Sequence, residues 1–115
     1  MINWTRVAEL EEDLGPDDMV EVFAVFRAEA EEVIDRLACL PDPLPQASEQ
    51  LQRDMHFLRG CAVNLGLDSL GDLCDAAEAN LASGRPDKVH LDEIVASYQR
   101  SVAAFRAALS PNDPN

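Results

Sequence analysis

Several residue types are scarce in this chain, and each scarcity argues against a class of protein. Its 115 residues include only nine lysines and arginines against 22 aspartates and glutamates, which gives a formal net charge of -13 at pH 7. Nucleic-acid-binding domains normally carry a basic surface, and anionic membranes attract basic segments, so we expect neither nucleic acid nor membrane as a partner. Acidity of this degree keeps a protein soluble without naming its partner.

Cysteines and long hydrophobic runs are also few. Cys39, Cys61 and Cys74 are odd in number and lack Cys-x-x-Cys spacing, so they predict neither a disulfide framework nor a zinc site. We expect small buried thiols in a reducing cytoplasm. The N-terminal residues contain no apolar run like a signal peptide, and no stretch approaches the roughly 20 apolar residues of a membrane span. The sequence therefore predicts a cytoplasmic protein.

What the chain does contain is apolar residues at helical spacing, without the alternation typical of strands. Hydrophobic residues make up 47% of it, enough for one core, whereas aromatic residues make up only 5%, as packing between Ala- and Leu-rich helices allows. Short connections favour antiparallel neighbours, so we predict an all-α fold: an up-down four-helix bundle with a short additional N-terminal helix. Residues 1–110 form the single domain, and residues 111–115 a disordered tail.

Breaks containing glycine and proline set the predicted helix boundaries. Asp17, which follows Gly15-Pro16, is expected to cap the second helix, and Gly66 suits the C-terminal end of the third. Three prolines within residues 41–45 end the second helix. The inward faces are expected to include Trp4, Val7, Leu10 and Val22. The predicted helices cover about residues 3–13, 17–37, 46 or 48 to 65, 68 or 69 to 82, and 90–109.

His56 is predicted to stand on the polar face of the third helix. At about 100° per residue, the apolar positions of this helix gather on the side opposite His56; they are Leu51, Met55, Leu58, Ala62 and Leu65. A buried histidine that serves only the core is therefore not expected. The sector around His56 consists of Gln52, Arg53, Arg59, Gly60, Val63 and Asn64.

Three of these neighbours predict a role for the exposed imidazole. Gly60 costs a helix roughly 1 kcal/mol relative to alanine, and it removes a side chain one turn from His56. Arg59 offers a guanidinium, which suits phosphoryl oxygens, and Val63 is apolar on a face where a solvated helix would be polar. Residues 51–67 carry a net charge of +1, and a neutral imidazole is a nucleophile. The pattern suits a phosphoryl group that arrives on His56 and leaves again.

The same residues resemble a known family. The run from His56 to Gly66 is similar to the HxLKGxxxxLG signature of histidine-containing phosphotransfer (HPt) domains, with Arg59 in place of the usual lysine and Cys61-Ala62 where small hydroxyl residues are common. The resemblance covers nearly the whole chain, because the predicted layout also fits. It implies that His56 is phosphorylated, that Arg59 helps to hold the phosphoryl group, and that Gly60 leaves room for a partner.

The resemblance further implies a phosphocarrier that is not itself an enzyme. Such domains shuttle a phosphoryl group between the aspartates of receiver domains in a multistep two-component phosphorelay, so the implied partners are response-regulator receivers, a hybrid histidine kinase, or both. No cofactor is expected on this chain, and Mg²⁺ is expected in the partner receiver. The predicted contact surface comprises Gln52, Arg53, Val63 and Asn64 beside the three site residues. The protein is expected to be a monomer that forms transient complexes.

Other interpretations remain open at this point. The chain could be a non-phosphorylated helical adaptor that docks on receivers or kinases, although such an adaptor has no need of the His56 imidazole. A small hydrolase would need a paired base and nucleophile, which the sequence lacks. His90, at the predicted start of the last helix, is interpreted as an ordinary exposed or capping residue. A metal site built from His56, His90 and Cys61 or Cys74 is disfavoured, because its ligands must converge and Cys61 lies about 140° around the helix from His56.

Overall fold

The computed structural model describes residues 2–40 and 49–109, and these residues are mainly α-helical. Apart from one isolated antiparallel bridge between Ile2 and Leu67, this part of the chain contains no β-structure, and the predicted all-α fold class is confirmed. The elements in chain order are α1 (Trp4–Leu14), α2 (Pro16–Ala38), α3 (Glu49–Leu65), α4 (Asp68–Ala82), the short 3₁₀ helix η1 (Pro86–Lys88) and α5 (Leu91–Leu109).

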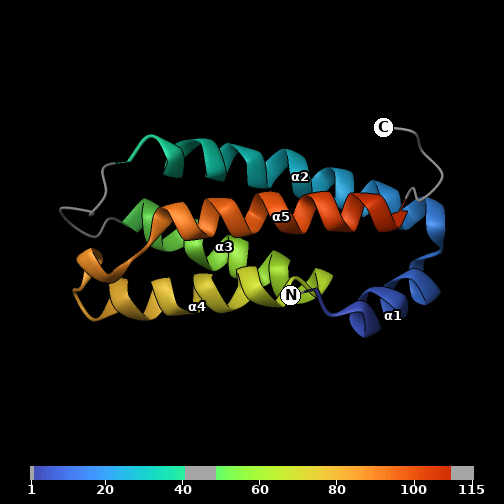
Figure 1. Cartoon of the computed structure of the whole chain (residues 1–115), viewed down its shortest axis with the longest axis horizontal. Helices are drawn as coiled ribbons and strands as arrows, with labels where there is room; N and C mark the ends of the chain where they lie inside the picture. The colour runs from blue at the N-terminus through green and yellow to red at the C-terminus, as the bar shows by residue number, and fades with distance from the viewer. Residues whose placement is uncertain (1, 41–48, 110–115) are drawn as a thin grey trace.

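The four long helices lie along the long axis of the molecule, and successive helices run in opposite directions (Figure 1). α3 packs most extensively on α4, and the pairs α4–α5, α5–α2 and α2–α3 complete a ring of neighbours. α1 lies at one end of the bundle, against α2 and α3 (Figure 1). Within residues 2–40 and 49–109, no helix has both the length and the apolar character needed to cross a bilayer.

The start of α2 differs from the prediction. Gly15, not Asp17, is the N-cap; its φ of 84° turns the chain between α1 and α2, and Pro16 occupies the first helical position. Proline is favoured there because its fixed φ suits the helix and its missing N–H needs no partner. Asp17 and Asp18 lie in the first turn instead, where their negative charge favours the helix dipole. The prolines within residues 41–45 lie outside the described residues.

The connection between α3 and α4 is short because Gly66 adopts a φ of 76°. Its carbonyl accepts a hydrogen bond of 2.6 Å from the Asn3 N–H, which fastens the start of α1 to this turn. Gly66 therefore does end α3, as predicted. α4 begins at Asp68 with Leu67 as its N-cap, so neither Asp68 nor Ser69 caps it. The predicted start of α3 at 46 or 48 and the predicted tail at 111–115 lie outside the described residues.

The core fills the space between the four long helices, and its largest fully buried side chains include Phe105, Met19, Leu37 and Met55. Two of the expected inward residues are not part of it: Trp4 is 47% exposed and Val22 is 40% exposed, whereas Val7 is buried and Leu10 packs partly against the core. Among the described helices, α1 packs against α2 and α3 at one end of the bundle, and this packing leaves Trp4 in its first turn exposed. The inward faces of α1 and α2 were thus both predicted wider than the bundle requires.

A buried carboxylate fastens α2 to α3. Asp54 is 5% exposed and accepts hydrogen bonds from Arg36 Nη2 at 2.7 Å and Nε at 3.2 Å, and from Gln50 Nε2 at 2.9 Å. Bonds of this kind between charged groups are about twice as strong as neutral ones. The Asp54 carboxylate raises the pKa of the Arg36 guanidinium further. The pairing holds the register of α3, and therefore the position of His56, relative to α2.

The cysteines are less uniformly buried than expected. Only Cys74 is buried, Cys61 is half-buried, and Cys39 is exposed where it caps the C-terminal end of α2. Burial, with a smaller contribution from the Glu78 carboxylate, raises the pKa of the Cys74 thiol to about 12. Burial also raises the pKa of Cys61. Both therefore stay neutral and unreactive near neutral pH, because the thiolate is the reactive form.

Candidate functional site

The imidazole of His56 projects from the outer face of α3. Its side chain is 73% exposed, whereas Met55, Leu58 and Ala62 on the opposite face are fully buried. Gly71 of α4 faces α3, where an added Cβ would be in ordinary van der Waals contact with the Ala62 Cβ at 3.7 Å. The outward orientation of His56 is therefore set by the apolar face of its own helix. Its surroundings are set by α4.

Glu78 of α4 is a neighbour of His56 that sequence reasoning missed. His56 Nδ1 lies 3.2 Å from Glu78 Oε1, and the Glu78 side chain is only 24% exposed. A carboxylate accepts but does not donate, so this contact favours the imidazole tautomer with its proton on Nδ1. That tautomer leaves the lone pair of Nε2 free. The spacing of Asp75 and Glu78 puts them on one face of α4, but only packing shows that this face meets α3.

Arg59 lies between the imidazole and α4. Its Nε is 3.3 Å from Glu78 Oε1 and 4.0 Å from Asp75 Oδ1, and its Nη2 is 3.5 Å from His56 Nδ1. Nδ1 cannot both donate to Glu78 and accept from Arg59, so the tautomer depends on which of these two contacts it makes. The positive charge inferred for residues 51–67 is offset in space, because two carboxylates of α4 face Arg59. Arg59 is held in place by these ion pairs while 35% of its side chain stays exposed.

Gly60 is exposed, and the fold itself does not require it. A Cβ built at Gly60 would meet nothing within 4 Å, whereas a Cβ at Gly66 would lie 2.8 Å from the Asn3 carbonyl oxygen. Gly60 also lies inside a helix, where glycine is unfavourable relative to alanine. Its lack of a side chain therefore leaves open surface one turn from His56 and satisfies no internal packing.

The structure divides the other predicted contact residues between two regions. Gln52 and Arg53 border a shallow depression of about 520 Å³ together with His56 and Phe57. The guanidinium of Arg53 is turned along its own helix, toward Gln50 at 3.3 Å and Glu49 at 3.9 Å. Val63 and Asn64 belong to a different hollow, on the other side of Arg59.

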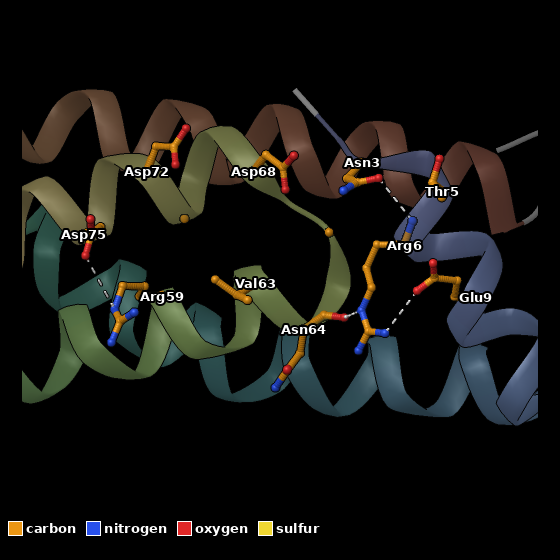
Figure 2. A pocket seen from close by; sticks show the side chains of 12 residues that line it. Asn3, Thr5, Arg6, Glu9, Arg59, Val63, Asn64, Asp68, Asp72 and Asp75 are labelled. Atoms are coloured by element: carbon orange, nitrogen blue, oxygen red, sulfur yellow. Dashed lines mark hydrogen bonds and ion pairs between the residues drawn. The ribbon is translucent and has the colours of Figure 1, made fainter.

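That second hollow is a groove between α1, α3 and α4, with a volume of about 790 Å³ (Figure 2). Val63 projects into the space between α3 and α4, and Asp75 points toward Arg59 (Figure 2). Arg6 closes one end: its Nε donates to the Asn64 carbonyl oxygen at 3.1 Å and its Nη1 pairs with Glu9 at 3.6 Å. We call this hollow the α1/α3/α4 groove.

A comparison with known protein families gives a match that covers most of the bundle. The sequence model described as the Hpt domain matches residues 21–109, which include all of α3, α4 and α5 and most of α2. The chain belongs to the Hpt domain family. Neither a curated protein nor a solved structure matches it.

Membership of the Hpt family indicates which kind of chemistry an exposed histidine can serve. Hpt domains are helical bundles that carry phosphoryl groups in two-component signalling, and they interact with receiver domains or kinases. The Hpt match starts at residue 21, so α1 and its contribution to the α1/α3/α4 groove lie outside the matched residues. Within residues 2–40 and 49–109, no three His, Cys, Asp or Glu side chains are grouped as a metal site would require.

Proposed function

We propose that this Hpt domain is a phosphorelay intermediate that accepts a phosphoryl group from one receiver aspartate on His56 and passes it to another. The observation that carries the proposal is the His56–Glu78 contact on an exposed helix face. On this proposal Nδ1 donates to Glu78, 3.2 Å away, so the nucleophilic Nε2 is free to reach into a partner's active site. The family match supports histidine phosphotransfer in general, and the geometry supports His56 as the site.

The proposed step is a reversible phosphoryl exchange. The Nε2 lone pair of His56 attacks the phosphorus of an aspartyl phosphate, an N–P bond forms, and the bond from phosphorus to the aspartate oxygen breaks. The aspartate leaves as a carboxylate, and the imidazole gains positive charge. Glu78, which accepts from Nδ1–H, stabilises that charge as it develops. In the second half, the same N–P bond breaks as another receiver carboxylate attacks.

The remaining groups would hold the reactants in place. Arg59 would place a guanidinium beside the transferred phosphoryl oxygens, where bidentate hydrogen bonds are strong. Gly60 would let the partner backbone approach, since it adds no side chain beside the imidazole. The partner receiver would supply Mg²⁺ and the aspartate, because phosphoryl transfer depends chiefly on positioning and charge stabilisation. On this proposal the protein is a cytoplasmic monomer and a phosphocarrier.

Transfer of radioactive phosphate tests the proposal. A receiver domain loaded with labelled phosphate is mixed with the protein, and the label on the protein is examined for acid lability and alkali stability. We expect such a label in the wild type and in His90→Gln, which removes the other histidine, also exposed. We expect none in His56→Gln.

Isolated labelled protein must also return its phosphate to a receiver. Label that persists in His56→Gln would disprove the site. A folded wild type that binds receivers and is never labelled would instead support the alternative, a non-phosphorylated adaptor.

A further inference from the structure

A row of carboxylates borders the α1/α3/α4 groove on its α4 side. Asp68, Asp72 and Asp75 are all exposed and line the groove, and their spacing of four and three residues keeps them on one side of α4 (Figure 2). We call these three residues the α4 acidic row. Asp68 has a local explanation, because it lies in the first turn of α4, where negative charge favours the helix dipole. Asp72 and Asp75 lie beyond that turn.

The fold gains little from the acidic row. Asp72 has no ion-pair partner among residues 2–40 and 49–109, and Asp75 reaches Arg59 only at 4.0 Å, while Glu78 holds the same arginine at 3.3 Å. Like charges three and four residues apart destabilise a helix slightly. The groove as a whole is lined by four carboxylates, including Glu9, against two guanidinium groups, Arg6 and Arg59. Its charge is therefore negative and only partly compensated.

The groove also exposes apolar surface. Val63 is 59% exposed and projects between α3 and α4 above the buried Gly71, whose added Cβ would touch it at 3.7 Å (Figure 2). Protein interfaces combine apolar side chains with a polar or charged rim, and Val63 beside the acidic row has this composition. An acidic row alone is common on a protein of this net charge. What distinguishes the acidic row is its position: it shares a groove with the exposed Val63 and with Arg59, which contacts His56.

The groove is continuous with the proposed phosphoryl site. Arg59 contacts Glu78 and His56 on one side and lines the groove with Asp75 on the other. Val63 lies about 10 Å along α3 from His56, at 1.5 Å per residue. Even a small interface, of about 600 Å² on each partner, is roughly 28 Å across. A receiver centred on His56 therefore also reaches Val63 and the end of the acidic row that lies beside Arg59.

We propose that the α1/α3/α4 groove selects the receiver partner by charge: it docks receivers that present lysine or arginine side chains beside an apolar docking surface, opposite Asp72 and Asp75. This inference rests on the proposed function, since it names the partner of the same site. A second copy of this chain is a poor occupant, because its acidic row would meet this one. Basic partners would be attracted over a distance, and receivers with an acidic rim would be rejected.

Binding of unphosphorylated receivers tests the inference without requiring phosphoryl transfer. The Kd of the receiver that binds the wild type most tightly is measured for wild type and for the double variant Asp72→Asn/Asp75→Asn, at low and at high salt. The matched control is Glu21→Gln/Asp35→Asn, which removes the same charge from exposed positions on α2, a helix that does not contact α4. We expect the groove variant to bind roughly fivefold more weakly at low salt, and the difference to shrink at high salt. The control should change the Kd by less than twofold.

A direct chemical donor separates this inference from the proposed function. Phosphoramidate transfers its phosphoryl group to histidine without a docking partner, so it should label His56 equally in wild type and in the groove variant. Weaker receiver binding with equal direct labelling supports charge selection. Charge selection would be overturned if both double variants lost the same affinity for the receiver, or if high salt did not reduce the loss. It would also be overturned if a receiver with an acidic docking face bound tightly. Absence of any label at His56, with binding still weakened, would overturn only the proposed function.

Discussion

One carboxylate oxygen of Glu78 joins the two groups on which the site depends. Its Oε1 lies 3.2 Å from His56 Nδ1 and 3.3 Å from Arg59 Nε, so an α4 residue orients both the imidazole and the guanidinium of α3. On the proposed function the contact would combine three functions: it would favour one tautomer, hold Arg59 beside the ring, and offer a negative charge to the imidazolium that forms during transfer. α4 is therefore part of the site as well as the support for α3.

Replacing Glu78 by glutamine should slow phosphoryl transfer without unfolding the protein. The amide can still accept a hydrogen bond, but it carries no charge to stabilise the developing imidazolium. In a site this exposed, a charge-assisted hydrogen bond is worth about 1.4 kcal/mol, which corresponds to about tenfold in rate. Rapid-quench measurement of transfer from a labelled receiver checks this. Asp75→Asn is the control, because it removes a carboxylate from the same face without contacting His56, and a saturating receiver makes its effect on binding irrelevant. Equal rates for Glu78→Gln and wild type would argue against a role for this contact.

Gly60→Ala should make the protein more stable and less active. Its Cβ would meet open space, and alanine is favoured over glycine in a helix, so the free energy of unfolding should rise by about 0.5 to 1 kcal/mol. Transfer from a receiver should slow, and Gly60→Gln should slow it further, because a larger side chain stands where the partner approaches. Urea denaturation and transfer rates measured on the same preparations test both effects. Unchanged transfer in Gly60→Gln would show that this surface is not covered by the partner.

Gly66→Ala should have the opposite effect on stability. Gly66 has a φ of 76°, and an added Cβ would lie 2.8 Å from the Asn3 carbonyl oxygen, a backbone atom that cannot move aside cheaply. We expect the free energy of unfolding to fall by about 2 kcal/mol or more, measured by urea denaturation. Gly15→Ala serves as a comparison, since Gly15 also has a positive φ but its Cβ would meet nothing within 4 Å. If Gly66→Ala lowers the free energy of unfolding no more than Gly15→Ala does, the turn at Gly66 relaxes to accept the Cβ.

The raised pKa of the Tyr98 phenol predicts how the free energy of unfolding falls at alkaline pH. Burial, with the charge of Glu31 adding and that of Arg27 opposing, raises the pKa of the Tyr98 phenol to about 12. The folded state therefore keeps its proton between the ordinary value near 10 and 12, while the unfolded state loses it, so stability decreases as pH rises through this interval. Between pH 9 and pH 11, the free energy of unfolding of Tyr98→Phe should fall by about 1 kcal/mol less than that of the wild type. The Tyr98 hydroxyl makes no hydrogen bond within the described residues, so the variant should be close to wild type at pH 7. Urea denaturation across this pH range checks it, and parallel curves for the two proteins would contradict it.

Much of this architecture follows from local pattern. The apolar stripe of α3 predicts that His56 faces outward, and the structure leaves 73% of its side chain exposed. Gly66 was predicted to end α3, and its positive φ confirms it. The prediction failed for Asp17, because Pro16 after a glycine with positive φ starts the helix earlier. It also failed for Trp4 and Val22, because periodicity marks an apolar face without saying whether another element covers it.

The sequence by itself determined the helices, their inward faces and the exposure of His56, because helix formation and amphipathic period are properties of neighbouring residues. Only the tertiary structure decided that Glu78 meets His56, that the acidic row borders Val63, and that Gln52 and Arg53 line a different hollow from Val63 and Asn64. These relationships join residues of different helices. They depend on which faces of α1, α3 and α4 pack together, and that choice is made by the fit of the whole core.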